Sequence, residues 1–271
     1  MGLGISTGLT YEDYVAPIGS VSFDGTNDYI DFDTGLGETV FGKTNLSPTS
    51  FQFWMRPDNN YTSASSVTRV ITFDNSATDR YWGISLGNTS ASLTNEVLAV
   101  SPNAGNRSAS QTNISANTWY HVVLVFSTNH YKIYLNGVDD TDETIVAADG
   151  GSAEDYSIST GWDQVEIGRG YLGSGGSRSY FGGRITELAS WSSALTPVEV
   201  LALYNNGVPV DPTSNYGTYT SSVDISTYYP CNQLVDTTGI YSTEKANNFI
   251  GTFQNGADFT SEATTGYYPG Y

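Results

Sequence analysis

The sequence predicts an all-β fold, either a sandwich or a barrel, with a single short helix. Many short runs of apolar and β-branched residues recur along the chain, separated by residues that favour turns. Helix signals are confined to one window of about eleven residues. The chain has 271 residues, of which 38% are hydrophobic, so it is long and apolar enough to bury a substantial core.

The first strands follow one another at turn-rich intervals. Residues 20–32 read SVSFDGTNDYIDF, in which Val21 and Phe23 alternate with polar residues and a turn-prone centre leads into a second apolar run. This pattern predicts two strands joined by a tight turn. Three further strands are predicted from the segments FQFWMR, RVITF and YWGISL, at residues 51–56, 69–73 and 81–86.

The middle of the chain carries the strongest strand and hairpin signals. Residues 119–126 read WYHVVLVF, a nearly continuous apolar run that is typical of a strand covered on both faces. Residues 131–135 read YKIYL and end at Asn136 and Gly137, a pair that strongly favours a two-residue hairpin turn. Two more strands are predicted at residues 165–168 and 183–191.

The one predicted helix spans residues 196–206. Thr196 fits the N-cap, Pro197 the first helical position and Glu199 the third, which together form a capping box. Val200, Leu201 and Leu203 supply an apolar stripe along this helix. Gly207 is the expected stop.

The charge balance excludes several functions. Lys and Arg total 10 against 28 Asp and Glu, so the net charge is −18, although only 14% of residues are charged. Such a chain repels phosphate backbones and anionic membranes, so we expect neither nucleic acid nor a membrane as partner. No stretch approaches the roughly 20 apolar residues of a membrane span. The single Cys231 excludes an intrachain disulfide and every multi-cysteine metal site.

Four motifs in order resemble the laminin-G-like, concanavalin A-like jelly-roll superfamily, in a form common in bacterial and viral proteins. The resemblance covers about 190 residues and implies an antiparallel jelly-roll of two sheets. The four motifs are FDGTNDYI at 23–30, FQFWMRP at 51–57, WYHVVLV with KIYLNG at 119–125 and 132–137, and IGR with FGGRITEL at 167–169 and 181–188.

The resemblance also suggests how the chain is divided. We expect an N-terminal arm at residues 1–19, the laminin-G-like domain at 20–210 and a C-terminal β-rich extension at 211–271, packed on the domain or on a neighbouring subunit. The segment GTFQNGADF at residues 251–259 is similar to the lead-in that usually precedes the opening strand of the family. It either adds strands to the sandwich or begins a truncated second unit.

The family often holds a structural calcium ion, for which Asp24 and Asp28 match the opening ligands. The late aspartate of the family's motif is Thr186 here, which removes one charged ligand. The alternative is that Asp24 and Asp28 cap turns. No cofactor is required, and calcium is the one expected ion.

A catalytic site is not expected. Glycanases of this superfamily resemble one another in an E-x-D-x-x-E strand whose carboxylates flank the glycosidic bond, and this chain has none. The acidic stretch at residues 139–143 follows a hairpin and is interpreted as a solvated loop. His121 lies in an apolar strand and is interpreted as a core histidine.

Saccharide binding is the activity that the loops favour. Tyr61, Trp162, Tyr171 and Tyr180 lie in predicted loops, where aromatic rings could stack on sugars and neutral side chains could bind hydroxyl groups. The alternative for all four is ordinary packing beneath long loops.

Three functions remain open. The first is a non-enzymatic virion surface protein, such as a phage capsid decoration, head-fibre or tail adhesin module. Its expected partners are other virion proteins, copies of itself and glycans of the host surface. Because the N-terminus lacks a basic region followed by an apolar core, we expect synthesis in the host cytoplasm and display on the virion. The second is a secreted or cell-surface carbohydrate-binding module of a bacterium, and therefore extracellular. The third, a glycan hydrolase, is disfavoured by the missing carboxylates.

Overall fold

A computed structural model describes most of the predicted strands and the helix. The residues that it describes are 19–32, 49–60, 68–75, 80–87, 97–100, 107–127, 130–143, 164–171, 178–231, 239–241, 250–255 and 257–261. The N-terminal arm predicted at residues 1–19 lies outside these ranges, except for Gly19.

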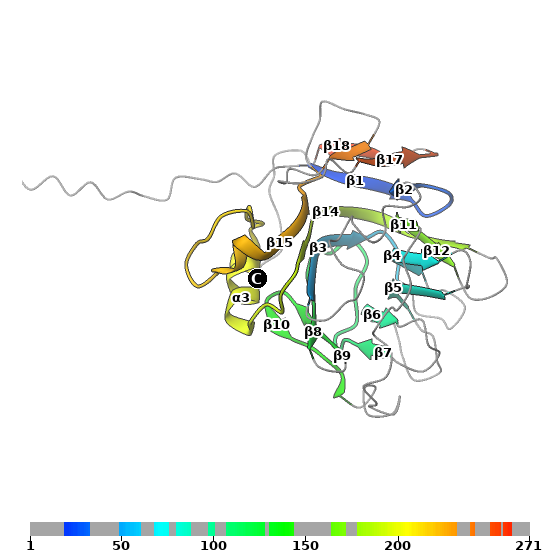
Figure 1. Cartoon of the computed structure of the whole chain (residues 1–271). Helices are drawn as coiled ribbons and strands as arrows, with labels where there is room; N and C mark the ends of the chain where they lie inside the picture. Colours follow the sequence, from blue (N-terminus) through cyan, green and yellow to red (C-terminus); the bar gives the residue numbers. More distant parts are fainter. Residues whose placement is uncertain are drawn as a thin grey trace, which may run out of the picture.

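Two antiparallel sheets form the sandwich that the sequence predicted (Figure 1). In the first sheet the order is β10-β9-β8-β3-β14-β1-β18, and β15 also pairs with β14. Its strands are β1 (Gly19–Asp24), β3 (Thr49–Pro57), β8 (Tyr120–Ser127), β9 (His130–Leu135), β10 (Val138–Asp139), β14 (Gly182–Trp191), β15 (Ile225–Tyr229) and β18 (Asp258–Ser261).

The second sheet has the order β16-β17-β2-β11-β4-β5-β6-β7, and a separate hairpin is formed by β12 and β13. These strands are β2 (Tyr29–Phe32), β4 (Thr68–Asn75), β5 (Arg80–Leu86), β6 (Val97–Val100), β7 (Arg107–Ala109), β11 (Gln164–Ile167), β12 (Arg169–Tyr171), β13 (Arg178–Tyr180), β16 (Gly239–Tyr241) and β17 (Ile250–Gln254).

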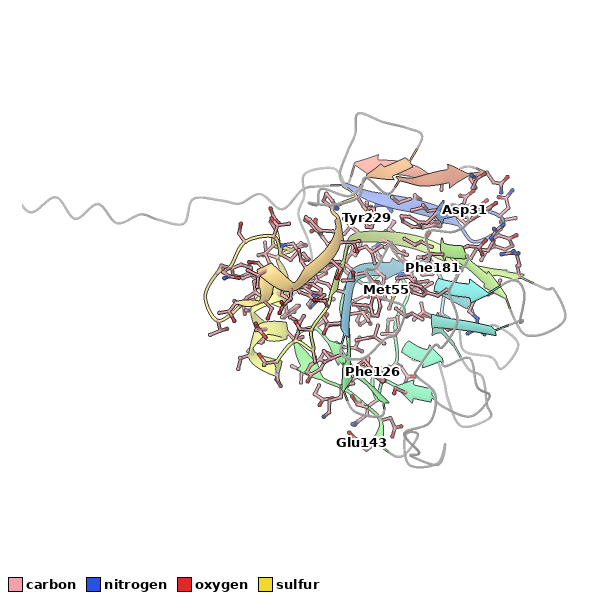
Figure 2. The ribbon with its side chains drawn as sticks, in the orientation of Figure 1. Asp31, Met55, Phe126, Glu143, Phe181 and Tyr229 are labelled. Carbon is pink, nitrogen blue, oxygen red and sulfur yellow. The ribbon has the colours of Figure 1, made fainter. Side chains whose placement is uncertain are left out.

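The core lies between the two sheets because alternate residues of their strands point inward. Phe51 of β3 meets Phe73 of β4 edge to face, with ring centroids 5.8 Å apart. Met55, Phe181 and Tyr229 belong to the same buried cluster (Figure 2). The prediction of an antiparallel jelly-roll sandwich is confirmed.

The outer face of the first sheet is covered by helix α3 (Pro197–Tyr204) and by the chain that follows it. Val123 and Val125 of β8 pack beneath this layer, whereas Val122 and Leu124 face the core, so β8 is buried on both faces as its sequence predicted. No helix of the described segments is long and apolar enough to cross a membrane.

Helix α3 begins as predicted and ends two residues earlier than the expected window. Glu199 Oε2 accepts the backbone N–H of Thr196 at 3.0 Å, which completes the capping box. Asn205 takes a left-handed conformation and ends the helix before the predicted stop at Gly207.

His121 lies beneath this helix as the core histidine that was expected. Its ring centroid is 4.9 Å from that of Trp54 and 5.9 Å from that of Tyr204. Burial lowers the pKa of His121 to about 3, so the ring is neutral at physiological pH.

The C-terminal strands join both sheets of the sandwich. Strand β18 pairs with β1 in the first sheet, and β17 pairs with β2 in the second. The consecutive strands β17 and β18 therefore extend one layer each on the same side, and of the two arrangements considered from the sequence, strand addition is the one found among the described residues (Figure 1).

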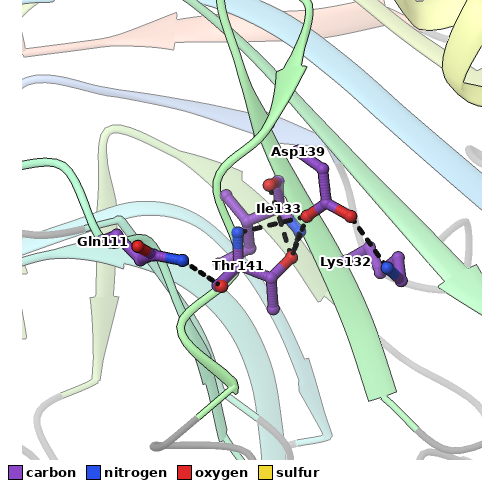
Figure 3. A network of polar contacts seen from close by, with 5 residues as sticks. All are labelled: Gln111, Lys132, Ile133, Asp139 and Thr141. Carbon is purple, nitrogen blue, oxygen red and sulfur yellow. Dashed lines mark hydrogen bonds and ion pairs between the residues drawn. The ribbon is translucent and has the colours of Figure 1, made fainter.

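The opposite side of the sandwich is closed by a polar network around Thr141 (Figure 3). Ile133 N–H donates to Thr141 Oγ1 at 3.0 Å, and Thr141 Oγ1 donates to Asp139 Oδ1 at 2.7 Å. Gln111 donates to the Thr141 carbonyl at 2.9 Å, and Lys132 pairs with Asp139 at 2.7 Å. The acidic stretch at residues 139–143, expected to be a solvated loop, therefore begins at the end of strand β10. It is bonded to β9 on one side and to residues 110–111 on the other.

Candidate functional site

Two turns meet at one corner of the sandwich, the β1–β2 turn and the chain around the β12–β13 hairpin. Glycines make this approach possible, because a Cβ on Gly25 would lie 3.1 Å from the Cα of Gly182. A Cβ on Gly168 would lie 2.5 Å from the ring of Phe23 and 3.3 Å from the carbonyl oxygen of Asp28. We call this region, formed by residues 24–29, 166–171 and 178–182, the corner site.

The two aspartates of the β1–β2 turn bind backbone N–H groups. Asp24 Oδ1 accepts from Thr26 at 2.7 Å and from Asn27 at 3.1 Å, and Asp28 Oδ2 accepts from Asp24 at 2.9 Å. The hydrogen bond from Thr26 is the main cause of the lowered pKa of Asp24, whereas burial raises the pKa of Asp28. Both carboxylates thus hold the turn in place.

Calcium takes six to eight oxygen ligands, and the two aspartates of this turn already accept backbone N–H groups. Among the described residues, no group of three or more Asp, Glu, His and Cys side chains is placed to hold a metal ion. Asp24 is paired with Gly182 in the sheet. Thr186, which replaces the family's late aspartate, is four residues further along β14 and therefore about 13 Å from Gly182 along the strand. The Thr186 hydroxyl instead lies 2.8 Å from the carbonyl oxygens of Gly19 and Pro230. The geometry supports the turn-capping alternative.

A buried carboxylate anchors the hairpin. Glu166 is 1% exposed on the outer side of β11, and its two oxygens accept from Arg169 and Arg178. The guanidinium carbon of Arg169 also lies 3.2 Å from the ring centroid of Tyr29. Because a buried charge is costly unless it is paired, these contacts tie β12 and β13 to the sheet.

Aromatic rings flank this charged group. Tyr180 is paired with Arg169 across the hairpin, and both Tyr180 and Tyr29 are half-buried, so each keeps part of its surface in contact with water. Tyr171 lies on β12 of the same hairpin, although its side chain is outside the described residues. The structure therefore brings Asp24, Asp28 and Tyr180 of the predicted site residues to one corner. Tyr61 and Trp162 lie outside the described residues.

Sequence reasoning missed Tyr29, Glu166, Arg169 and Arg178. Two signals could have found three of them. The chain has only ten Lys and Arg residues, and two of these, Arg169 and Arg178, flank a single loop next to a predicted strand. Glu166 lies between the apolar residues Val165 and Ile167 of that strand, so period-two alternation places it on the outer face.

The arrangement is suited to contact with a polar ring. Partly exposed phenol rings can stack on the apolar face of a sugar, and their hydroxyl groups can bind its hydroxyls. General acid catalysis needs a carboxyl group that reaches the glycosidic oxygen. Both oxygens of Glu166 already accept from guanidinium groups.

Comparison with known proteins agrees with this fold. Residues 24–201 match the family model of the concanavalin A-like lectin/glucanases superfamily. No curated protein matches the chain.

Three solved structures illustrate the likeness. A Bacteroides ovatus protein, provisionally described as carbohydrate-binding, is 17% identical with a TM-score of 0.60, covering 92% of this chain and 61% of its own. A heptameric SAP-like pentraxin of Limulus polyphemus is 16% identical, with a TM-score of 0.49 and coverage of 88% and 96%. Domain 4 of a Geobacillus stearothermophilus extracellular arabinanase, in complex with arabinotriose, is 16% identical, with a TM-score of 0.44 and coverage of 69% and 87%. At these identities the likeness concerns the fold alone, and this chain spans about three fifths of the Bacteroides protein.

Proposed function

Because the chain belongs to the concanavalin A-like lectin/glucanase superfamily, we propose that it is a non-enzymatic, lectin-like module that binds a saccharide weakly at the corner site. The observation that carries this proposal is the placement of two partly exposed tyrosines, Tyr29 and Tyr180, beside an arginine held by Glu166. Preorganised side chains of this kind lose little conformational entropy on binding.

The expected affinity is low. An aromatic contact contributes roughly 0.5–1.5 kcal/mol beyond area burial, so two rings with a few hydrogen bonds correspond to a dissociation constant on the order of 1 mM. Useful binding would then depend on display of many copies on one surface, which raises the effective affinity.

Glycan-array binding of a multivalent form of the protein tests the site. We expect wild-type protein to bind and Tyr180→Ala to lose the signal. The matched control Val223→Ala changes a side chain that is 81% exposed outside the corner site, and this variant should bind like wild type. Absence of wild-type binding to any glycan would refute the saccharide proposal, and equal binding by Tyr180→Ala would refute the site.

The non-enzymatic part has a separate test. Incubation with the polysaccharides identified on the array, followed by a reducing-end assay, is expected to yield no product, because the chain lacks the E-x-D-x-x-E strand and Glu166 is engaged. Release of reducing ends that scales with protein concentration would show that the module is a hydrolase.

We further propose that the module is displayed on the outside of a virus particle, bound to other virion proteins and to copies of itself. A net charge of −18 with only three lysines supports dense exterior display, because like-charged modules resist self-association. The same composition supports a bacterial cell-surface module equally well. Mass spectrometry of purified virions and of a bacterial surface fraction decides between them, and presence only in the latter would replace the virion proposal.

A further inference from the structure

Three asparagines in the chain precede glycine, at residues 136–137, 206–207 and 255–256. This pair is chemically reactive because glycine has no side chain to shield its backbone nitrogen. The nitrogen attacks the asparagine side-chain carbonyl carbon, ammonia leaves and a succinimide ring forms. Water then opens the ring to aspartate or isoaspartate. The three pairs share this chemistry, so their surroundings decide which of them reacts in the folded protein.

The pair at Asn136 is protected by the fold. Its Oδ1 accepts the backbone N–H of His121 at 3.0 Å, and its own N–H donates to the His121 carbonyl at 2.9 Å. Gly137 is buried against α3, since a Cβ there would lie 3.0 Å from atoms of both Leu201 and Tyr204. Ring closure at Asn136 would require both hydrogen bonds to break in a space that the helix fills.

The Asn255 side chain makes one hydrogen bond to the part of the chain that the structure describes. Its Nδ2 donates to the carbonyl oxygen of Asn27 at 3.1 Å, at an exposed position. One solvent-exposed hydrogen bond restrains the side chain less than the two contacts and the packing around Asn136.

The pair at Asn206 is the least protected. Gly207 is buried, as Gly137 is, but Asn206 itself is exposed, and its side chain makes no hydrogen bond to any residue in the described part of the chain. It lies within three consecutive residues of positive φ, at 44° for Asn205, 55° for Asn206 and 87° for Gly207. Because L-residues disfavour successive left-handed conformations, this turn is strained, and it follows directly after the end of α3, where local opening is easiest.

We propose that Asn206 is a site of spontaneous conversion to aspartate and isoaspartate in the folded protein, ahead of Asn255 and far ahead of Asn136. The product adds a negative charge at the C-terminal end of α3, where the helix dipole disfavours it. It also alters the backbone two residues after Tyr204, which stacks on Trp54 at 6.0 Å. The modification therefore loosens the helix from the first sheet.

Peptide mapping by mass spectrometry compares the three sites within one molecule. After incubation of the folded protein at mildly alkaline pH, we expect the gain of about one mass unit to appear at Asn206 at least about tenfold faster than at Asn136, the ratio expected for breaking two hydrogen bonds. In urea the three rates should converge, because each site is then a plain Asn-Gly pair. Equal rates at Asn136 and Asn206 in the folded protein would overturn the proposal.

A variant separates the modification from its consequence. Asn206→Gln should abolish the product at residue 206 and leave the rates at the other two sites unchanged. The modified wild-type fraction, separated by ion exchange, should show altered tryptophan fluorescence, whereas incubated Asn206→Gln protein should not. Fluorescence identical in modified and unmodified protein would contradict the loosening of α3.

Discussion

Replacing Glu187 by glutamine removes a carboxyl group that the fold holds in its protonated form. Glu187 is 1% exposed at the irregular step of β14, where it has a positive φ of 54°. Its Oε2 accepts the hydroxyl of Tyr228 at 2.5 Å, and its Oε1 has no hydrogen-bond partner among the described residues. Burial raises the pKa of Glu187 to about 8, although the Tyr228 hydroxyl lowers it and Asp211 raises it further.

The size of the effect follows from this pKa. Between pH 4.5 and about 8 the folded protein keeps a proton that the unfolded chain releases, so the stability of the wild type falls as the pH rises. A pKa difference of about 3.5 at about 1.4 kcal/mol per pH unit corresponds to about 5 kcal/mol. Glutamine imitates the protonated acid, so Glu187→Gln should match the wild type near pH 4.5 and exceed its stability near pH 8.

Urea denaturation followed by tryptophan fluorescence, repeated across this pH range, measures the difference between the two proteins. The comparison cancels the contributions of every other titrating group. A difference in unfolding free energy that stays constant from pH 4.5 to about 8 would refute the reasoning, because it would mean that Glu187 ionises equally in both states.

Two variants serve as controls. Glu143 is exposed, so Glu143→Gln should change the free energy of unfolding by no more than about 0.5 kcal/mol. Tyr228→Phe removes the hydrogen bond that lowers the pKa of Glu187. In this variant, which keeps Glu187, the free energy of unfolding should therefore continue to fall to a higher pH than in the wild type.

Three further predictions concern hydrogen bonds that hold loops in place. Burial opposes ionisation of Glu199, but hydrogen bonds led by that of the Ser221 hydroxyl outweigh it and lower the pKa to about 2. Glu199→Gln should therefore cost about 2 kcal/mol at neutral pH, and urea titrations should show this cost shrinking as the pH falls from 4.5 toward 2. Thr141→Val leaves the buried N–H of Ile133 without its acceptor and should cost about 1–3 kcal/mol in thermal unfolding, whereas a cost below about 0.5 kcal/mol would contradict the network. Asp24→Ala should lower the free energy of unfolding by about 1 kcal/mol, because two hydrogen bonds of the turn are lost. Adding calcium or a chelator should not change the melting temperature of the wild type. A calcium-dependent rise in melting temperature that this variant loses would restore the metal-site interpretation.

Several elements could be read from local pattern because the deciding forces are local. Capping residues placed the start of α3, and the pair Asn136–Gly137 supplied the two positive φ values, 50° and 81°, that its hairpin needs. The apolar run of β8 indicated burial on both faces before the covering helix was known. The short strands β6, β7, β12 and β13 were missed, because three or four residues give too little alternation to detect.

Only part of the candidate site could be predicted, because its contacts join residues of different strands. Tyr180 was singled out as an aromatic residue in a loop, but its partners depend on how the hairpin folds back over β4. Gly170 makes that fold possible, because a Cβ there would lie 2.0 Å from Thr72 Oγ1. Nothing in the local sequence states that Glu166 will meet Arg178 across this turn.

By itself the sequence determined the β class, helix α3, the net negative charge and the absence of the glycanase carboxylate motif, since each of these follows from composition or short-range periodicity. The tertiary structure decided which groups face one another. Asp24 and Asp28 became turn caps, Glu166 became the anchor of a hairpin, and Glu187 became a buried acid beside Tyr228, 41 residues away in the chain. Periodicity reports which face of a strand is buried, whereas the neighbours on that face depend on strand order and register, which are set by packing of the whole core.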